Sequence, residues 1–145
     1  MRKVFVPLSL MASAMALTGC AQADYAAGEK EPQLTEKQQV KLDKKLAGRV
    51  AGEPVSCIQR SRVRNFTAIS DDVLLYEVGD TVYVNQPYGG CPGVTRDTLV
   101  TRATTNRLCS GDIARVTDLQ IGIDVGSCAF SEFVPYRKVE EDSAD

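Results

Sequence analysis

The chain contains no histidine and no tryptophan, and the missing histidine restricts its chemistry most. Without histidine it has neither a Ser-His-Asp nor a Cys-His catalytic arrangement, and no histidine-based metal site. Acidic residues outnumber basic ones by 19 to 17, so the basic excess of a general nucleic-acid binder is also missing. We therefore expect no nucleic-acid partner, and the remaining candidates for chemistry are carboxylates and cysteines.

Long hydrophobic runs are missing as well, except near the N-terminus. Residues 4–17 form an apolar stretch of 14 residues, interrupted by Pro7, Ser9 and Ser13. A membrane-spanning helix needs roughly 20 apolar residues, so this stretch is too short to span. Because Arg2 and Lys3 precede it, the pattern indicates an export signal rather than a transmembrane anchor.

The end of this signal matches a bacterial lipobox, Leu17-Thr18-Gly19-Cys20. We therefore predict that residues 1–19 are removed and that Cys20 receives diacylglycerol on its thiol, making a membrane the first partner. Residue 21 is alanine, whereas an aspartate at this position is the usual signal that retains a lipoprotein in the inner membrane. We therefore expect the protein to be anchored in the outer membrane, facing the periplasm. Cleavage removes two of the 17 basic residues and no acidic one, so the predicted mature charge is −4.

Two segments are expected to connect Cys20 to the folded domain. Residues 20–33 are mostly small and polar, which predicts a flexible tether. Residues 34–54 are predicted to contain a helix, over about 35–47, followed by a linker. Thr35 and Gln38 have the spacing of a capping box.

The predicted helix is amphipathic, with a thin apolar stripe. Leu42 and Leu46 lie one turn apart, and Gly48 or Gly52 is expected to end the helix. We interpret it as a solvated helix packed weakly on the domain, with docking to a partner as the alternative.

Residues 55–138 change to an alternating apolar and polar pattern, which predicts a mainly β domain. Short strands separated by turn signals favour a small antiparallel barrel or sandwich of about six strands. The expected strands lie at 62–69, 73–78, 81–85, 98–104, 113–117 and 127–134, with a turn over 122–126. Residues 139–145 are expected to be a disordered acidic tail.

Gly79-Asp80 is a two-residue hairpin signal that predicts a strand register. It places Tyr76 opposite Tyr83 and Leu75 opposite Val84. One face then collects four apolar residues suited to a core, and the other face collects Leu74 with the two tyrosines. The four core candidates are Val73, Leu75, Val82 and Val84.

The chain has five cysteines, and four remain once Cys20 is assigned to lipid. An even number in an oxidising compartment predicts two disulfides among Cys57, Cys91, Cys109 and Cys128, with three connectivities open. We favour Cys91–Cys109, which flank one strand, and Cys57–Cys128, at the two ends of the domain. The absence of any CxxC pair argues against a zinc site or a thiol redox site.

The remaining polar motifs give no catalytic, metal or cofactor residue. Asp71-Asp72 are adjacent, so in extended chain their side chains point to opposite sides, and their position between two strands favours a turn. Residues 88–93 are glycine-rich but are followed by neither a helix nor a lysine. They are interpreted as a tight turn that positions Cys91.

Arg60, Arg62 and Arg64 have period-two spacing, which places them on one face of the expected strand. A solvated sheet face accounts for them. The alternative is contact with an anionic partner, such as lipid phosphate, a glycan carboxylate or an acidic envelope protein.

Five short motifs are spread over residues 46–136. They are Leu46-Ala47-Gly48-Arg49, Gly52-Glu53-Pro54-Val55-Ser56-Cys57-Ile58, Cys91-Pro92-Gly93, Leu108-Cys109-Ser110-Gly111-Asp112, and Cys128 with Phe133-Val134-Pro135-Tyr136. Together they resemble a family of small proteobacterial envelope proteins of unknown function. The resemblance implies a secreted or lipid-anchored β-rich domain with paired cysteines, and supplies no activity, ligand or catalytic residue.

These observations predict a lipid-anchored envelope protein that acts as a non-enzymatic binding or structural module. A carboxylate-dependent enzyme acting on envelope glycans or peptides is the first alternative. A carrier that holds a small ligand inside a barrel is the second.

Overall fold

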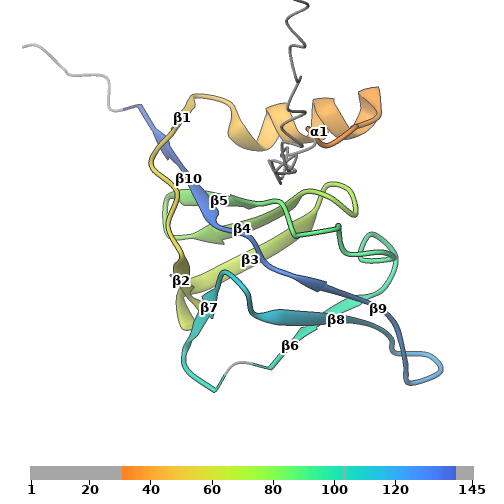
Figure 1. The fold of residues 1–145 in the computed structure, drawn as a ribbon. Helices are drawn as coiled ribbons and strands as arrows, with labels where there is room; N and C mark the ends of the chain where they lie inside the picture. The colour runs from red at the N-terminus through yellow and green to blue at the C-terminus, as the bar shows by residue number, and fades with distance from the viewer. Residues whose placement is uncertain (1–30, 103, 140–145) are drawn as a thin grey trace, which may run out of the picture. The chain divides into compact units, whose positions relative to one another are not determined.

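The computed structural model describes residues 31–102 and 104–139, and this part of the chain is mainly β (Figure 1). It contains ten strands in three antiparallel sheets and one α-helix, and the sheets do not close into a barrel. The predicted class, a small sandwich preceded by a helix, is therefore confirmed, while the barrel alternative is not. The predicted signal peptide, Cys20, residues 21–30 of the tether and residues 140–145 of the tail lie outside the described residues.

The large sheet is antiparallel and has the strand order β1-β10-β5-β4-β3. Its strands are β1 (Arg49–Ala51), β3 (Val63–Ala68), β4 (Leu74–Val78), β5 (Thr81–Asn85) and β10 (Phe133–Lys138). The edge strand β1 comes from the segment predicted as helix and linker.

The β4–β5 hairpin turns at Gly79-Asp80, where Gly79 has a φ of +60° that a residue without Cβ adopts readily. The predicted register is confirmed, because the turn chemistry and the burial pattern agree on it. The pairs are Val78 with Thr81, Tyr76 with Tyr83, and Leu75 with Val84.

Two smaller sheets complete the fold. One pairs β2 (Cys57–Gln59) with β7 (Arg107–Cys109), and the other has the order β6-β8-β9. The strands of the second are β6 (Thr98–Thr101), β8 (Ile113–Asp118) and β9 (Ile123–Ala129). The prediction of about six strands was too low, because β1, β2 and β7 have three residues each and are too short to show alternation.

The predicted strand at 127–134 is wrong, and the predicted turn at 122–126 is correct only at Gly122. The first range covers the end of β9 and the start of β10, and residues 123–126 already belong to β9. Gly126 signalled a turn in the sequence but lies in β9 beside an irregularity in the β8–β9 register. Glycine inside a strand often marks such a bulge or a close backbone approach.

The predicted helix is present as α1 (Glu36–Leu46). The Thr35 hydroxyl oxygen accepts a hydrogen bond from the backbone N–H of Gln38, and Gln38 Oε1 accepts one from the backbone N–H of Thr35, so the capping box is confirmed. Gly48, with a φ of +67°, follows the helix C-cap. Lys45 forms a salt bridge of 2.7 Å with Glu77 of β4 and joins the helix to the large sheet.

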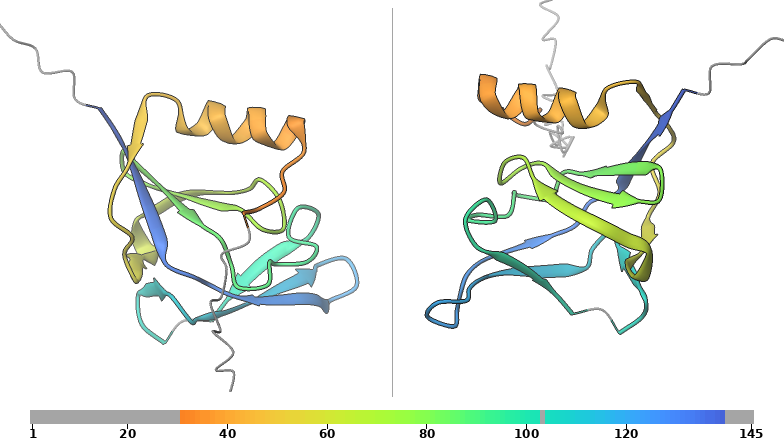
Figure 2. Two further views of the ribbon diagram at one scale, coloured as in Figure 1. Left: turned by 45° about the horizontal axis from the view of Figure 1, so that its top comes forward. Right: turned by 180° about the vertical axis from the view of Figure 1, so that it is seen from behind.

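The large sheet has a hydrophobic cluster on each face, with α1 over one face and the smaller sheets over the other (Figure 2). Helix α1 covers one face through Leu42 and Leu46, which pack on the four predicted core residues of the β4–β5 region. The small sheets cover the other face, where the Tyr76 ring contacts Phe66, Phe130 and Phe133. Both faces of β4 are therefore buried, and Tyr76 packs in an aromatic cluster as well as facing Tyr83 across the strands.

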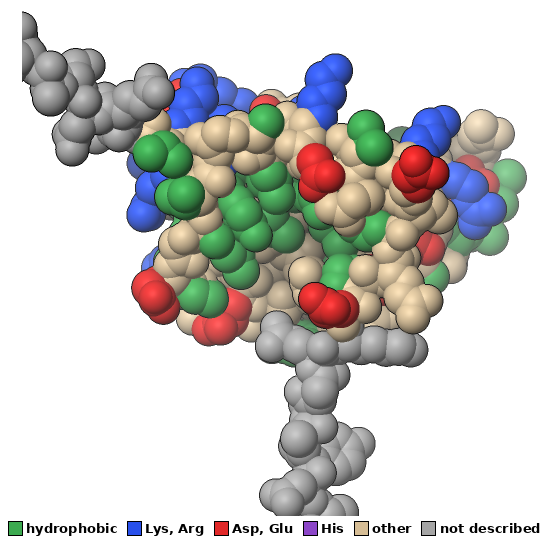
Figure 3. All heavy atoms as spheres, turned by 90° about the horizontal axis from the view of Figure 1, so that it is seen from above, with side chains coloured by type: hydrophobic (Ala, Val, Ile, Leu, Met, Phe, Trp, Pro, Cys, Tyr) green, Lys and Arg blue, Asp and Glu red, His purple; other side chains and the backbone are tan. Residues whose placement is uncertain are grey.

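Seen from the helix side, hydrophobic side chains gather in one area, with Lys and Arg side chains toward the upper edge of the view and several Asp and Glu side chains toward the lower edge (Figure 3). No helix of the described residues has both the length and the apolar character needed to cross a membrane.

Candidate functional site

All four cysteines of the β domain form disulfides. Cys57 and Cys109 face each other in the β2–β7 pair, with their Cα atoms 4.0 Å apart. Cys91 and Cys128 are the second pair, with a Cα–Cα distance of 4.9 Å and both side chains buried. The prediction of two disulfides is confirmed.

The favoured connectivity, Cys91–Cys109 with Cys57–Cys128, is wrong. It assumed that the first and last segments of the domain lie side by side at their cysteines. The structure instead pairs β2 with β7, two three-residue strands that the sequence did not reveal, which places Cys109 opposite Cys57. Cys128 of β9 is then left for Cys91 in the loop after β5.

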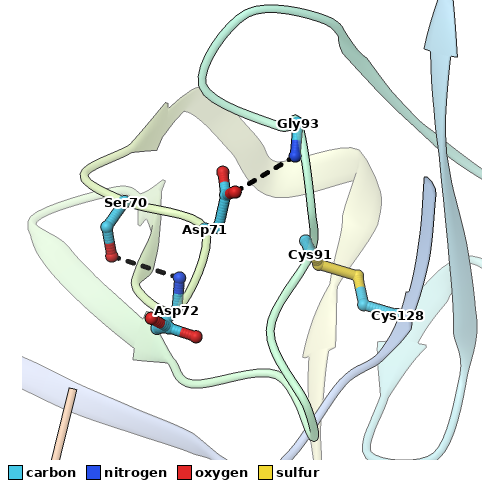
Figure 4. Close-up of a disulfide and its surroundings, with 6 residues drawn as sticks. All are labelled: Ser70, Asp71, Asp72, Cys91, Gly93 and Cys128. Atoms are coloured by element: carbon cyan, nitrogen blue, oxygen red, sulfur yellow. Dashed lines mark hydrogen bonds between the residues drawn. A yellow bond between two sulfur atoms is a disulfide. The ribbon is translucent and has the colours of Figure 1, made fainter. Parts of the chain in front are cut away.

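The Asp71-Asp72 pair lies in the connection between β3 and β4, as predicted, and the two side chains point in different directions (Figure 4). Asp71 holds the glycine-rich loop: its carboxylate accepts a hydrogen bond of 3.1 Å from the backbone N–H of Gly93. Its carbonyl accepts one of 2.6 Å from the N–H of Cys91. The predicted role of this loop, positioning Cys91, is consistent with these contacts, and Asp71 serves as the anchor.

The three predicted arginines do not share one strand face. Arg60 and Arg62 lie in a short 3-10 helix, η1 (Arg60–Arg62), and only Arg64 belongs to β3. The period-two argument fails because a 3-10 helix has three residues per turn. An irregularity in the β3–β4 register next to Arg64 breaks the alternation further.

The arginines are nevertheless exposed, and no ion pair to them occurs among the described residues. Arg107 is also exposed and lies next to this segment in the fold. Its neighbour in the chain, Asn106, accepts a hydrogen bond of 3.1 Å at its carbonyl from the backbone N–H of Arg60. We call Arg60, Arg62, Arg64 and Arg107 the arginine surface. Contact with an anionic partner at this surface stays a prediction.

A second exposed feature is the tip of the β8–β9 hairpin, residues 119–123. Leu119, Ile121 and Ile123 are 69%, 65% and 54% exposed, and Val125 next to the tip is 43% exposed. Gly122, with a φ of +71°, makes the turn, and its N–H donates to the carbonyl of Asp118 at 2.8 Å. Three large aliphatic residues therefore lie within five consecutive positions at this end of the hairpin, outside both core clusters.

An ion pair lies beside this tip, on the outer face of the hairpin. Arg115 Nη1 is 3.0 Å from Asp124 Oδ2, and the Thr117 hydroxyl donates to Asp124 Oδ1 at 2.8 Å. The hydrogen bond from Thr117, and then the guanidinium of Arg115, lower the pKa of Asp124 below its ordinary value. The Asp124 charge is therefore neutralised locally.

Sequence reasoning missed the hairpin tip. The segment Leu119-Gln120-Ile121-Gly122-Ile123 alternates large aliphatic residues through a turn, whereas turns are rich in small and polar residues. Large aliphatic residues at turn positions were therefore the sequence signal that could have revealed this exposed tip. It was missed because the turn between the strands expected at 113–117 and 127–134 was placed at residues 122–126.

Within residues 31–102 and 104–139, no group of three or more Asp, Glu or Cys side chains is arranged to hold a metal ion. The chain matches no protein-family model, and comparisons with curated proteins and with solved structures find no similar protein, so the resemblance to the envelope family stays a prediction.

Proposed function

We propose that this protein is a non-enzymatic binding module of the bacterial cell envelope, anchored through lipid on Cys20 to the outer membrane and facing the periplasm. The observation that carries the proposal is the pairing of the four other cysteines with one another. It leaves no intramolecular cysteine partner for Cys20, which is the lipobox cysteine. Two disulfides also fit an oxidising compartment.

The arginine surface supports a binding role. Its four guanidinium groups are exposed on adjacent elements, and salt bridges of the described residues engage none of them. Guanidinium groups pair with phosphate and carboxylate groups in two-pronged hydrogen bonds. We infer an anionic envelope component, glycan, lipid or acidic protein, as the partner.

The anchor is tested by expressing the full chain in a Gram-negative host with a clickable fatty acid. We expect labelling that depends on Cys20, and sedimentation with the outer-membrane fraction of a density gradient. The Cys20→Ala chain should be unlabelled and should leave the membrane. Persistence of that variant in the membrane with normal maturation would refute the anchor.

Binding at the arginine surface is tested with a photo-crosslinking amino acid in place of Arg62. We expect a defined cross-linked product in intact envelopes, lost when Arg60 and Arg64 are both replaced by glutamate. The matched control is Lys37→Glu with Lys44→Glu on helix α1, which makes the same charge change elsewhere and should keep the product. A product that survives the arginine changes as well would contradict the assignment.

A further inference from the structure

The tip of the β8–β9 hairpin presents an aliphatic surface without charge. Residues 119–123 contain three large aliphatic side chains, one glutamine and one glycine. Leu119, Ile121 and Ile123 are more than half exposed and belong to neither core cluster. A folded domain gains nothing by ordering such side chains in water, so the tip is built for contact with an apolar phase or surface.

Two backbone N–H groups of the tip and the carboxylate of Asp124 have hydrogen-bond partners within the hairpin. The carbonyl of Asp118 accepts the N–H of Gly122, and its carboxylate accepts the N–H of Gln120, both at 2.8 Å. Asp124 is bonded to Arg115 and Thr117. Polar backbone that is already paired lowers the cost of moving the turn out of water.

The hairpin is also held firmly at its base. Cys128 of β9 is bonded to Cys91, and the backbone of Gly126 lies against Pro92 so closely that a Cβ there would clash with the Pro92 carbonyl. The tip therefore projects from a fixed support, visible in Figure 1 as the loop between β8 and β9.

We propose that residues 119–123 insert into the interfacial region of a lipid bilayer and give the domain a second, shallow contact with a membrane. The proposal deepens the proposed function and rests on it in one respect, because lipid on Cys20 would hold the tip near a bilayer. Residues 21–33 span at most about 43 Å when extended. A domain of about 100 residues has a radius of gyration of about 13 Å, hence a diameter of roughly 35 Å. The tether is therefore long enough for the tip to reach the anchoring membrane even if the tether joins the domain at the side opposite the tip.

The chemistry of the tip favours lipid over a protein partner. Energetically dominant residues of protein interfaces are enriched in Trp, Tyr and Arg, and the tip has none of them. Three aliphatic side chains on a protruding turn need no complementary pocket to enter fluid hydrocarbon. The charged residues of the hairpin, Arg115, Asp118 and Asp124, together with Arg102 near Asp124, sum to zero, so insertion should occur in zwitterionic lipid and change little with salt.

The absence of tryptophan from the chain allows a direct test. Ile121→Trp places a single reporter at the tip, and Val40→Trp, at a 62% exposed position of α1, is the matched control. Both full-length lipidated variants are reconstituted into phosphatidylcholine vesicles. Brominated lipid should quench the tip reporter by half or more and the helix reporter only slightly, whereas aqueous iodide should do the opposite.

Equal quenching of the two reporters by iodide, with none by brominated lipid at the tip, would overturn the proposal. So would protection of the tip reporter that rises with protein density and is insensitive to brominated lipid, because that result assigns the tip to a second copy of the chain.

A separate readout distinguishes failure of the anchor. Vesicle flotation at low lipid concentration reports the lipid on Cys20: the triple variant Leu119→Ser, Ile121→Ser, Ile123→Ser should float normally, and Cys20→Ala should not. At high lipid concentration the unanchored Cys20→Ala chain with the tip reporter should still show quenching by brominated lipid. The two claims are thus read from different measurements, and either can fail alone.

Discussion

Removal of the Cys57–Cys109 disulfide should lower the free energy of unfolding by about 4 kcal/mol. The bond joins residues 52 positions apart. In the loop-entropy model, closing a loop of that length reduces the entropy of the unfolded chain by about 14 cal/mol/K, which corresponds to about 4 kcal/mol at 25 °C. Domains of this size have total stabilities of 5–15 kcal/mol, so the loss is a large share of the total.

The measurement is equilibrium unfolding in urea, followed by far-UV circular dichroism, for the unmodified chain and the double variant Cys57→Ala, Cys109→Ala. The two disulfide loops, 57–109 and 91–128, overlap in sequence, so the loss from removing both bonds should not equal the sum of the single losses. A destabilisation below about 1 kcal/mol would refute the entropic reasoning.

A second double variant tests the connectivity itself. Cys57→Ala with Cys128→Ala leaves Cys91 and Cys109, the pair that the sequence favoured. In the structure these two cysteines belong to different bonds, so we expect two titratable thiols in the purified variant. An intramolecular disulfide between them would mean that the β2–β7 pairing is wrong.

Three further changes probe local features of the fold. Thr35→Ala removes the N-cap of α1 and should cost about 1 kcal/mol in urea unfolding, whereas Thr35→Ser should restore most of it. Gly90→Ala should destabilise the fold by about 1–3 kcal/mol, because Gly90 has a φ of +73° and the new Cβ would lie 2.6 Å from Asp72 Oδ1. Gly111→Ala is the control for backbone strain alone, because Gly111 also has a positive φ but has open space around it. The hydrogen bond from Lys45 lowers the pKa of Glu77 below its ordinary value of 4.5. The stability that the Lys45–Glu77 salt bridge contributes is therefore fully present above pH 4.5 and is lost as the pH falls through the lowered pKa. Glu77→Gln should therefore cost about 0.5 kcal/mol at neutral pH and almost nothing at low pH, and a difference that grows on acidification would contradict this sign.

The predictions from sequence that succeeded depend on local signals. The helix was found because Thr35 and Gln38 define its start and Gly48 follows its end. The β4–β5 hairpin was found because a two-residue turn fixes the register of the strands on both sides. Both kinds of signal lie within about ten residues of the structure that they specify.

Most of the failures concern contacts between distant segments, or strands and helical turns too short to show a pattern. Cys57 and Cys109 meet only because two three-residue strands pair across 52 positions, and nothing local to either cysteine records that pairing. Arg60 and Arg62 were assigned to a strand because the apolar pattern of β3 was extended backwards, into a 3-10 turn whose carbonyl partner comes from Asn106. Pairing between distant strands is a property of the folded chain that composition and period do not determine, whereas the β4–β5 register follows from its local turn.

The tip of the β8–β9 hairpin was also missed in the sequence, and its structure explains why. Its aliphatic residues were misassigned because Gly122 and Gly126 were treated as one turn, although only Gly122 has a positive φ and Gly126 continues β9 against Pro92. The same Gly126 contact and the Cys91–Cys128 bond fix the base of the hairpin. The base is therefore ordered by a covalent bond and close backbone packing, whereas the tip is ordered without any core contact of its own. A rigid support of this kind reduces the entropy lost when the tip enters a second phase, so the disulfide that stabilises the fold also prepares the exposed turn for contact.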